Sequence, residues 1–311
     1  MRRVALIYGN VFLKHETGAH SENRRRVISV YEYLESKPLF NNLIQLGPRA
    51  ARAEDILLVH TKAYYDALCR LPRDEFCYLD ADTIFGPGSL EAALNAAGAV
   101  TLAVDKIKSN AIDSAFCLVR PPGHHARPGR AMGFCIFNNI AIGAAYATRV
   151  CGFERAAIID LDVHHGNGTQ EAFYEDGNVL FASLHQWPFY PGTGLPNESG
   201  AGKGSGKTIN APLAARSGEA EYMEALRERI LPAVSAHRPS IIFVSAGFDA
   251  HEADPIGGMS LDTESYGRLT RTIVQVASKT CDGRIISALE GGYNLDALAA
   301  SVHAHIEALL E

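Results

Sequence analysis

The sequence of 311 residues lacks several patterns that would indicate a specialised class of protein. No uninterrupted apolar stretch approaches the roughly 18 residues of a membrane span, so we expect no membrane insertion. The six cysteines show no Cys-x-x-Cys spacing, which argues against a disulfide scaffold and against a thiolate zinc site. Lysine and arginine (29) do not outnumber aspartate and glutamate (35), and the net charge of −6 argues against a polybasic binder of nucleic acid or of anionic membranes.

The N-terminal stretch is also unlike a signal peptide. Residues 1–9 begin with two arginines after the methionine, and the apolar run is too short for a signal-peptide core, so it indicates a first strand. The apolar fraction of 47% and the charged fraction of 21% are ordinary for a soluble globular chain. We therefore expect a cytoplasmic protein whose cysteines stay reduced.

Segments with helical periodicity alternate with short apolar runs along most of the sequence. Apolar residues at three- and four-residue steps predict helices at Ser89–Lys108, Tyr222–Val234, Tyr266–Val276 and Leu295–Leu310, with Asp262 as the N-cap of the third. The apolar runs predict strands at Val4–Tyr8, Ala115–Val119, Ala156–Ile159, Val179–Ala182, Ile241–Val244 and Arg284–Ala288. These runs do not alternate polar with apolar residues, which is typical of a parallel sheet covered on both faces. We expect one α/β domain.

Polar residues follow most of the predicted strands directly. In open parallel sheets, ligands bind beyond the carboxyl ends of the strands. The segments found there are Arg120–Ala126, Asp160–Gly168, Ser183–His185, Ser245–Asp249 and Leu289–Tyr293. We therefore expect His, Asp, Gly and Tyr side chains from distant parts of the sequence to meet at one rim.

Asp162 and His164 are candidate metal ligands. They are two residues apart at a strand end, so the period of two turns both side chains to the same face. One carboxylate oxygen and one imidazole nitrogen suit zinc, and a further carboxylate completes a three-ligand catalytic site with an open position. Asp249, at the end of another strand, is the natural third ligand. No surplus carboxylates surround Asp162 and His164, so we expect a single bound metal.

The tandem histidines His124 and His125 follow a Pro-Pro-Gly turn. Asp160 and Asn167 flank the metal-binding tripeptide, and each can accept a ring N–H and so fix the orientation of a histidine. A histidine held beside a metal-activated water can take its proton and hand it to a leaving amine. Tyr293 can bring a phenol hydroxyl to an oxyanion opposite the metal, although a buried core tyrosine is an equally simple interpretation.

Together these motifs resemble the zinc-dependent histone deacetylase family, which includes bacterial deacetylases, acetylpolyamine amidohydrolases and acetoin-utilisation proteins. The resemblance rests on Arg-Pro-Pro-Gly-His-His-Ala (120–126), Gly-Phe-Cys-x-Phe-Asn-Asn (133–139), Asp-x-Asp-x-His-His-Gly-Asn-Gly-Thr-Gln (160–170), Ser-Ala-Gly-Phe-Asp-Ala (245–250) and Leu-Glu-Gly-Gly-Tyr (289–293). It covers nearly the whole chain in the family's order. The Gly-Asn-Gly-Thr-Gln form is similar to the class II branch.

The resemblance implies the arginase/deacetylase fold, in which a central, mostly parallel sheet of about eight strands lies between helices, as one catalytic domain over residues 1–311. It implies that Zn²⁺, or alternatively Fe²⁺, is held by Asp162, His164 and Asp249. His125 would then act as general base and general acid, with His124 as its electrostatic partner.

The resemblance also implies roles for the remaining motif residues. Asp160 would orient His124, Asn167 would orient His125, and Tyr293 would polarise the amide carbonyl and stabilise the oxyanion. Further implied positions are a substrate tunnel (Gly133, Phe134, Tyr190, Ile256, Gly291, Gly292 and Asp82), a structural K⁺ site (Asp160, Asp162, His164, Ser183 and Leu184) and a product channel (Arg26).

The substrate is left open by the sequence. The leading hypothesis is a deacetylase that removes acetyl or other short acyl groups from lysine-like amines of peptides or proteins. Relatives specialised for polyamines place a carboxylate at the tunnel mouth, where this sequence has Ile256, but Asp80 and Asp82 could supply one. Deacetylation of acetylpolyamines or other small amides is therefore an alternative. A third possible function is that of a non-catalytic protein that uses the metal pocket to bind a ligand or partner. The sequence leaves the oligomeric state open.

Overall fold

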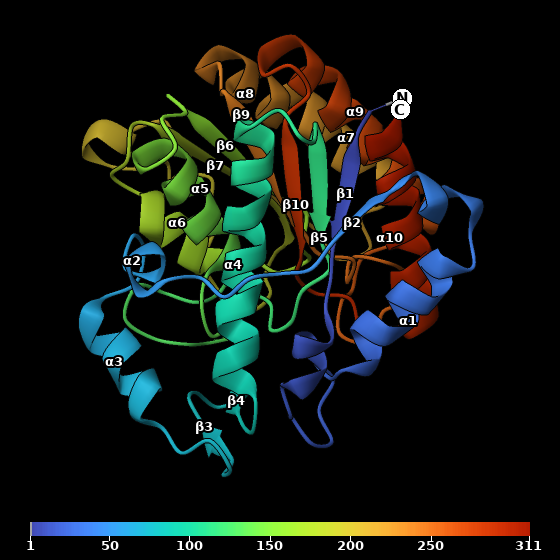
Figure 1. The fold of residues 1–311 in the computed structure, drawn as a ribbon. Coiled ribbons are helices and arrows are strands. Elements are labelled where there is room, and N and C mark those ends of the chain that lie inside the picture. The colour runs from blue at the N-terminus through green and yellow to red at the C-terminus, as the bar shows by residue number, and fades with distance from the viewer. Residues whose placement is uncertain (1) are drawn as a thin grey trace.

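One parallel sheet forms the centre of the structure, a computed structural model that describes residues 2–311 (Figure 1). Its strand order is β2-β1-β5-β10-β9-β6-β7-β8, and neighbouring strands pair in parallel. The strands are β1 (Val4–Ile7), β2 (Ile44–Leu46), β5 (Ser114–Cys117), β6 (Ala156–Asp160), β7 (Val179–Gln186), β8 (Thr208–Leu213), β9 (Ile241–Ala246) and β10 (Ile285–Leu289). A separate antiparallel pair joins β3 (Cys77–Tyr78) and β4 (Ile84–Phe85). The expected fold class, α/β with a parallel sheet of eight strands flanked by helices, is confirmed.

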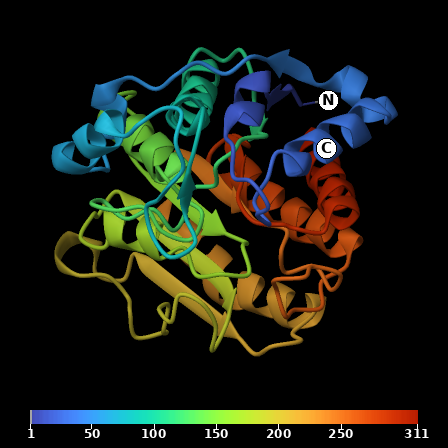
Figure 2. The ribbon, with the colours of Figure 1, turned by 90° about the horizontal axis from the view of Figure 1, so that it is seen from below.

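Helices cover both faces of this sheet, as Figure 2 shows. They are α1 (Arg25–Glu35), α2 (Ala53–Ile56), α3 (Lys62–Arg70), α4 (Ser89–Lys108), α5 (Asn139–Arg149), α6 (Asn167–Phe173), α7 (Glu219–Ala225), α8 (Leu231–His237), α9 (Thr263–Thr280) and α10 (Leu295–Leu310). Asp262 caps α9 as expected, because its side chain accepts a hydrogen bond from the Ser265 N–H at 2.7 Å. Within residues 2–311, no helix is both long enough and apolar enough to cross a membrane.

The strands are apolar along their whole length because they lie between two hydrophobic cores, one on each face of the sheet. In β6, Ala157 and Ile159 pack into the core under α1 and α7–α10, whereas Ala156 and Ile158 pack into the core under α4 and α5. Because successive side chains of a strand point to opposite faces, a strand buried on both faces must be apolar throughout. This is why the strand runs of the sequence do not alternate.

Two of the predicted helices coincide with the structure and one is interrupted. The predictions at Ser89–Lys108 and Leu295–Leu310 match α4 and α10, and the prediction at Tyr266–Val276 lies within α9. The segment predicted as a helix at Tyr222–Val234 is helical throughout, but it is not one regular α-helix, because a π-helical turn at Leu226–Ile230 joins α7 to α8. The hydrogen bonds of this turn join residues i and i+5, so it contains one residue more than an α-helical turn. The apolar residues still recur along the segment, and their spacing in the sequence does not reveal the extra residue.

The six predicted strands correspond to β1, β5, β6, β7, β9 and β10, whereas the two edge strands were not predicted. Strand β2 has only three residues and is largely exposed, so it has no apolar run to detect. Strand β8 contains Asn210 and Pro212, both of which are uncommon inside a sheet. Proline is tolerated there because an edge strand has one unpaired side.

A buried ion cluster fastens the N-terminal segment to the end of β5. The Glu22 carboxylate accepts two hydrogen bonds from the Arg120 guanidinium, at 2.6 and 2.8 Å, and lies 3.2 Å from Arg26 Nη1. All three side chains are buried. Burial alone would raise the pKa of Glu22, but the charge and hydrogen bonds of Arg120 outweigh it and lower that pKa from 4.5 to about 2.

This cluster predicts how the Glu22→Gln variant behaves. Since the folded pKa of Glu22 lies below the unfolded value, its contribution to stability is present above pH 4.5 and is lost as the pH falls toward 2. At pH 7 the variant should lose roughly 3–5 kcal/mol of unfolding free energy, because Arg120 is left buried without its partner. The unfolding free energy of the variant should also lack the decrease between pH 4.5 and pH 2 that Glu22 causes in the wild type. Urea denaturation at a series of pH values measures both effects.

The control is Glu54→Gln, which removes an exposed carboxylate paired with Arg52. Its stability should change by less than about 0.5 kcal/mol. Equal stability of Glu22→Gln and wild type at pH 7 would contradict the assignment of Glu22 as a structural anion.

Candidate active site

The segments that follow β5, β6, β9 and β10 meet at the carboxyl edge of the sheet. Figure 2 shows the molecule from this side. Strand β6 ends at Asp160, so Asp162 and His164 lie in the turn after it. The prediction that the two-residue period of a strand turns both side chains to one face is therefore wrong, because neither residue belongs to the strand. The turn itself brings the two residues together, because the His164 backbone N–H donates to Asp162 Oδ1 at 2.9 Å.

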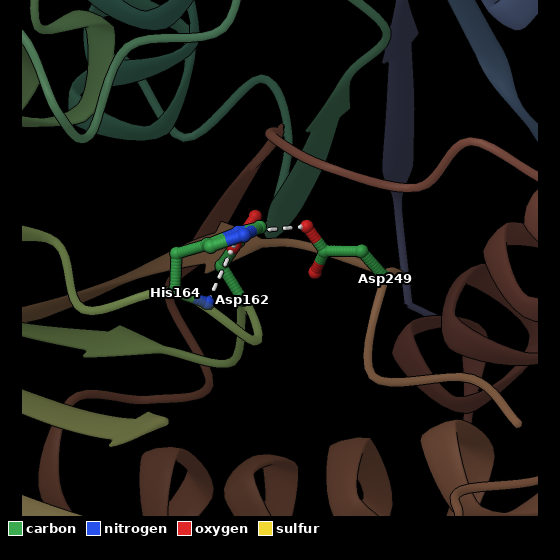
Figure 3. A group of neighbouring side chains, drawn as sticks. All are labelled: Asp162, His164 and Asp249. Atoms are coloured by element: carbon green, nitrogen blue, oxygen red, sulfur yellow. Dashed lines mark hydrogen bonds and ion pairs between the residues drawn. The ribbon is translucent and has the colours of Figure 1, made fainter. Parts of the chain in front are cut away.

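Asp162, His164 and Asp249 form a buried cluster (Figure 3). One ligand atom from each residue lies within 4.8 Å of the others. His164 Nδ1 is 3.0 Å from Asp162 Oδ1 and 3.2 Å from Asp249 Oδ2. The structure therefore brings together the three residues predicted as metal ligands from two segments that are far apart in the sequence.

The cluster fits a divalent cation on its own chemistry. Asp249 Oδ2 is buried with no hydrogen-bond donor in suitable geometry among the described residues. Burial raises the pKa of Asp249, and the negative charge of Asp162 adds to the effect. The buried Asp249 carboxylate is thus short of positive charge, and the O, N, O donor set of the cluster is one that zinc accepts.

Metal binding should therefore stabilise the fold. With zinc at a hundredfold excess over its Kd, the unfolding temperature of metal-free wild type should rise by roughly 5 °C. Asp249→Ala should abolish most of this rise, because it removes one of three ligands, whereas Asp74→Ala, which removes an exposed carboxylate outside the cavity, should keep it. Differential scanning calorimetry with and without zinc measures the shift. A full shift in Asp249→Ala would show that zinc binds elsewhere.

The tandem histidines lie beside this cluster with their rings 4.0 Å apart. His124 Nδ1 is 3.0 Å from Asp160 Oδ2, and His125 Nδ1 is 2.8 Å from Asn167 Oδ1. Both pairings are those expected from the sequence. Each Nδ1–H is oriented by an oxygen acceptor, which leaves the Nε2 atom of each ring for other partners.

Opposite pKa shifts distinguish the two rings. Burial disfavours a charged His124, but the charges of Asp162 and Asp160 outweigh burial and raise its pKa well above the ordinary value. Burial lowers the pKa of His125, and the positive charge of His124 lowers it further. At neutral pH this arrangement favours a charged His124 beside a neutral His125, which is free to accept a proton.

Tyr293 completes the site from the loop after β10. A Cβ at Gly291 would overlap the carboxylates of Asp249 and Asp162, so only glycine allows the loop to pass this close to the cluster. Burial raises the pKa of Tyr293 well above its ordinary value, so the phenol keeps its proton and can donate a hydrogen bond. The Arg26 guanidinium lies over the ring, 4.8 Å from its centroid.

A cavity of about 260 Å³ leads to these residues. Its walls are Asp82, Pro122, His124, His125, Gly133, Phe134, His164, Phe189, Tyr190, Ile256, Gly291 and Tyr293. The predicted tunnel residues are therefore all in the wall except Gly292. Phe189 and Pro122 were not predicted; Phe189 stacks on the His164 ring at 5.1 Å, and its only signal in the sequence was its position next to Tyr190.

The structure places the remaining predicted residues without testing their roles. Arg26 is fully buried and donates to the carbonyl oxygens of Glu290 and Gly292, behind Tyr293. Asp160 and Ser183 are register partners in β6 and β7, so part of the predicted K⁺ set is adjacent. A product channel at Arg26 and a K⁺ site at the sheet edge stay predictions.

A parallel α/β sheet that carries a buried Asp–His–Asp cluster, a histidine pair and a tyrosine at its carboxyl edge has the features of a candidate metal-dependent active site. Comparison with known proteins specifies it further: the sequence model of the histone deacetylase domain matches residues 20–309. The chain belongs to the histone deacetylase family.

Individual relatives agree with this assignment. A probable deacetylase of Archaeoglobus fulgidus is 41% identical over 294 residues, which cover 94% of this chain and 81% of that protein. Chloroplastic histone deacetylase 14 of Arabidopsis thaliana is 41% identical over 326 residues, covering 98% of this chain and 76% of that protein. The crystal structure of the HDA15 HD domain has a TM-score of 0.93 at 35% identity and covers 98% of this chain and 90% of that one. Membership of the family supports a deacetylase, and therefore a hydrolase.

Proposed function

We propose that the protein is a metal-dependent amidohydrolase that removes an acetyl or another short acyl group from the amine of a lysine-like side chain. The observation that carries the proposal is the single cavity whose wall joins His125, His164 and Tyr293, with the Asp162–His164–Asp249 cluster beside it. A metal ligand, a neutral histidine and a phenol donor together can supply an activated water, a proton acceptor and oxyanion stabilisation, which suffice for hydrolysis of an unactivated amide.

Asp162, His164 and Asp249 would hold the cation, which when bound would polarise the substrate carbonyl and make water more acidic. The role of the protein groups follows from their placement. His125, held by Asn167, accepts the proton of the attacking water and later delivers it to the amine nitrogen as the C–N bond breaks. His124, held by Asp160, keeps a positive charge beside it.

Tyr293 and the cavity walls would act on the substrate itself. The protonated phenol donates a hydrogen bond to the oxygen on which negative charge develops. Phe134, Phe189 and Tyr190 give the cavity an aromatic lining that suits the methylene chain of a lysine-like side chain. Because such walls exclude water, they strengthen the interactions at the reacting amide.

Two substitutions test the assigned roles. Tyr293→Phe should lower kcat on an acetyl-lysine peptide by about 10²–10³-fold, since it removes one donor to the oxyanion. His125→Ala should lower kcat by at least about 10²-fold, since it removes the proton acceptor. Tyr33→Phe, which removes a phenol on α1 beside His303, should leave kcat unchanged. The measurement is steady-state kinetics with zinc-loaded protein at neutral pH.

If zinc-loaded wild type left every acyl-lysine and acyl-amine reporter intact, the hydrolytic proposal would be wrong. The retained pocket would then point to a non-catalytic protein that binds a ligand or a partner, the third interpretation of the sequence.

A second candidate substrate class is the acylated polyamines. Asp82 lines the cavity together with apolar Ile256, so one carboxylate is available to a distal ammonium group of the substrate. The aromatic and apolar residues of the wall suit the side chain of an acyl-lysine peptide, which needs no second positive charge for binding. Comparing acetylspermidine with an acetyl-lysine peptide separates the two classes.

Asp82→Asn sharpens this comparison. If polyamines are the substrates, the loss of the carboxylate should lower kcat/KM for acetylspermidine by roughly tenfold and that for an uncharged acetyl-lysine peptide by less than threefold. Asp282→Asn, which makes the same charge change in an exposed turn before β10, is the control. Equal effects on both substrates would remove the case for polyamine recognition by Asp82.

A further inference from the structure

The loop that carries Tyr293 is held by charged side chains on several sides. The Gly291 N–H donates to Asp162 Oδ2 at 2.8 Å, and the Gly292 carbonyl accepts from Arg26 Nε at 2.7 Å. The Tyr293 N–H donates to Asp254 Oδ2 at 2.6 Å. Asp254 has no part in the chemistry described above, yet it binds the backbone of the tyrosine itself.

We propose that Asp254 is a positioning residue that fixes Tyr293 relative to the rim turn 254–258, which carries Ile256. The inference rests on the proposed function, because it concerns the phenol that acts on the substrate oxygen. The Asp254 carboxylate then has two roles. It keeps the Tyr293 phenol in position to reach the substrate oxygen, and it keeps Ile256 in place in the cavity wall.

The geometry of Asp254 supports both roles. Its Oδ2 atom accepts from the backbone N–H groups of Tyr293 and Asn294, at 2.6 and 3.3 Å. Its Oδ1 atom accepts from those of Ile256 and Gly257, at 2.9 and 3.3 Å. The residue is 8% exposed, so these backbone donors would find little water in place of the carboxylate.

The rim turn is itself anchored at two points and can therefore serve as a reference for Tyr293. A Cβ at Gly257 would overlap the Asp249 carbonyl oxygen, so the turn packs directly on the backbone of a metal-ligand residue. At the other end of the turn, the Gly258 N–H donates to Gln186 Oε1, at the end of β7, at 3.0 Å. Asp254 thus connects Tyr293 to two fixed points of the sheet edge.

Tyr293 needs this connection because of the glycine before it. Gly292 has a φ of 122°, a conformation that is easy for glycine and strained for other residues. Without Asp254, the peptide unit before Tyr293 would keep only the hydrogen bond from Arg26 to the Gly292 carbonyl, which leaves the phenol more room to move. Since a displacement of about 1 Å at a reacting centre can cost up to 10²-fold in rate, the hydrogen bond from Tyr293 to Asp254 has consequences for kcat.

The test is a double-mutant comparison. Asp254→Ala should lower kcat on an acetyl-lysine peptide by roughly 10- to 100-fold in the wild-type background. In a Tyr293→Phe background it should lower kcat by less than threefold. The phenylalanine ring has no hydroxyl to donate, so a change in its position has little further effect on the rate. A purely structural role would lower kcat by the same factor in both backgrounds, and that result would overturn the proposal.

Hydrogen–deuterium exchange of the metal-free protein gives a readout that does not depend on turnover. Asp254→Ala should speed exchange at the amides of residues 293 and 294, and leave that of residues 156–160 in β6 unchanged. Unchanged exchange at 293 and 294 would overturn the positioning role. Inactive wild type would overturn only the proposed function, since the exchange experiment still decides the role of Asp254.

Two further variants complete the design. Asp262→Ala removes the carboxylate that caps α9 and should change neither kcat nor exchange at residues 293 and 294. If Asp254→Ala does not fold, Asp254→Asn carries the same test, because an amide has one acceptor oxygen and cannot serve the four N–H groups that the carboxylate holds. Wild-type kinetics and exchange in a folded Asp254→Asn variant would contradict the proposal.

Discussion

The site depends on a concentration of negative charge that the fold buries at the carboxyl edge of its sheet. Asp162 and Asp249 approach the same imidazole of His164, and all three are withdrawn from water. Burying two carboxylates together is unfavourable unless a positive charge compensates them. A divalent cation supplies such a charge, and the charge on His124 is favoured for the same reason.

The surrounding groups follow from that constraint. Burial and the positive charge of His124 lower the pKa of His125, which favours a neutral imidazole in the cavity wall. Gly291 has no side chain because the carboxylates of the cluster occupy the space where one would lie. The loop that must pass so close to the cluster then delivers Tyr293 on a glycine pair, and charged side chains from other segments hold it.

The sequence predicted this site well because its polar residues directly follow buried strands. A strand covered on both faces has an apolar run that ends abruptly, as β6 does before Asp162, and parallel strands bring their carboxyl ends to one edge. The motifs and the family resemblance then supplied the pairings of His124 with Asp160 and of His125 with Asn167. Strands β2 and β8 were missed because edge strands need not be apolar.

Other residues could not be predicted because their contacts are between distant segments. Asp254 looks like part of a polar Asp-Pro turn in the sequence, and only the fold brings it to the Tyr293 backbone. Glu22 pairs with Arg120 across 98 positions of the chain, and no local pattern marks a buried carboxylate. The turn after β6 shows a related limit, since hydrogen bonding of the His164 backbone, and not strand periodicity, brings the side chains of Asp162 and His164 together.

Anomalous X-ray diffraction at the zinc edge, from crystals of the zinc-loaded protein, can show whether the buried carboxylates hold a cation. We expect one strong anomalous peak per chain, about 2.0–2.2 Å from one ligand atom each of Asp162, His164 and Asp249. A peak held by other side chains, or three ligand side chains that stay together around no ion at saturating zinc, would contradict this expectation.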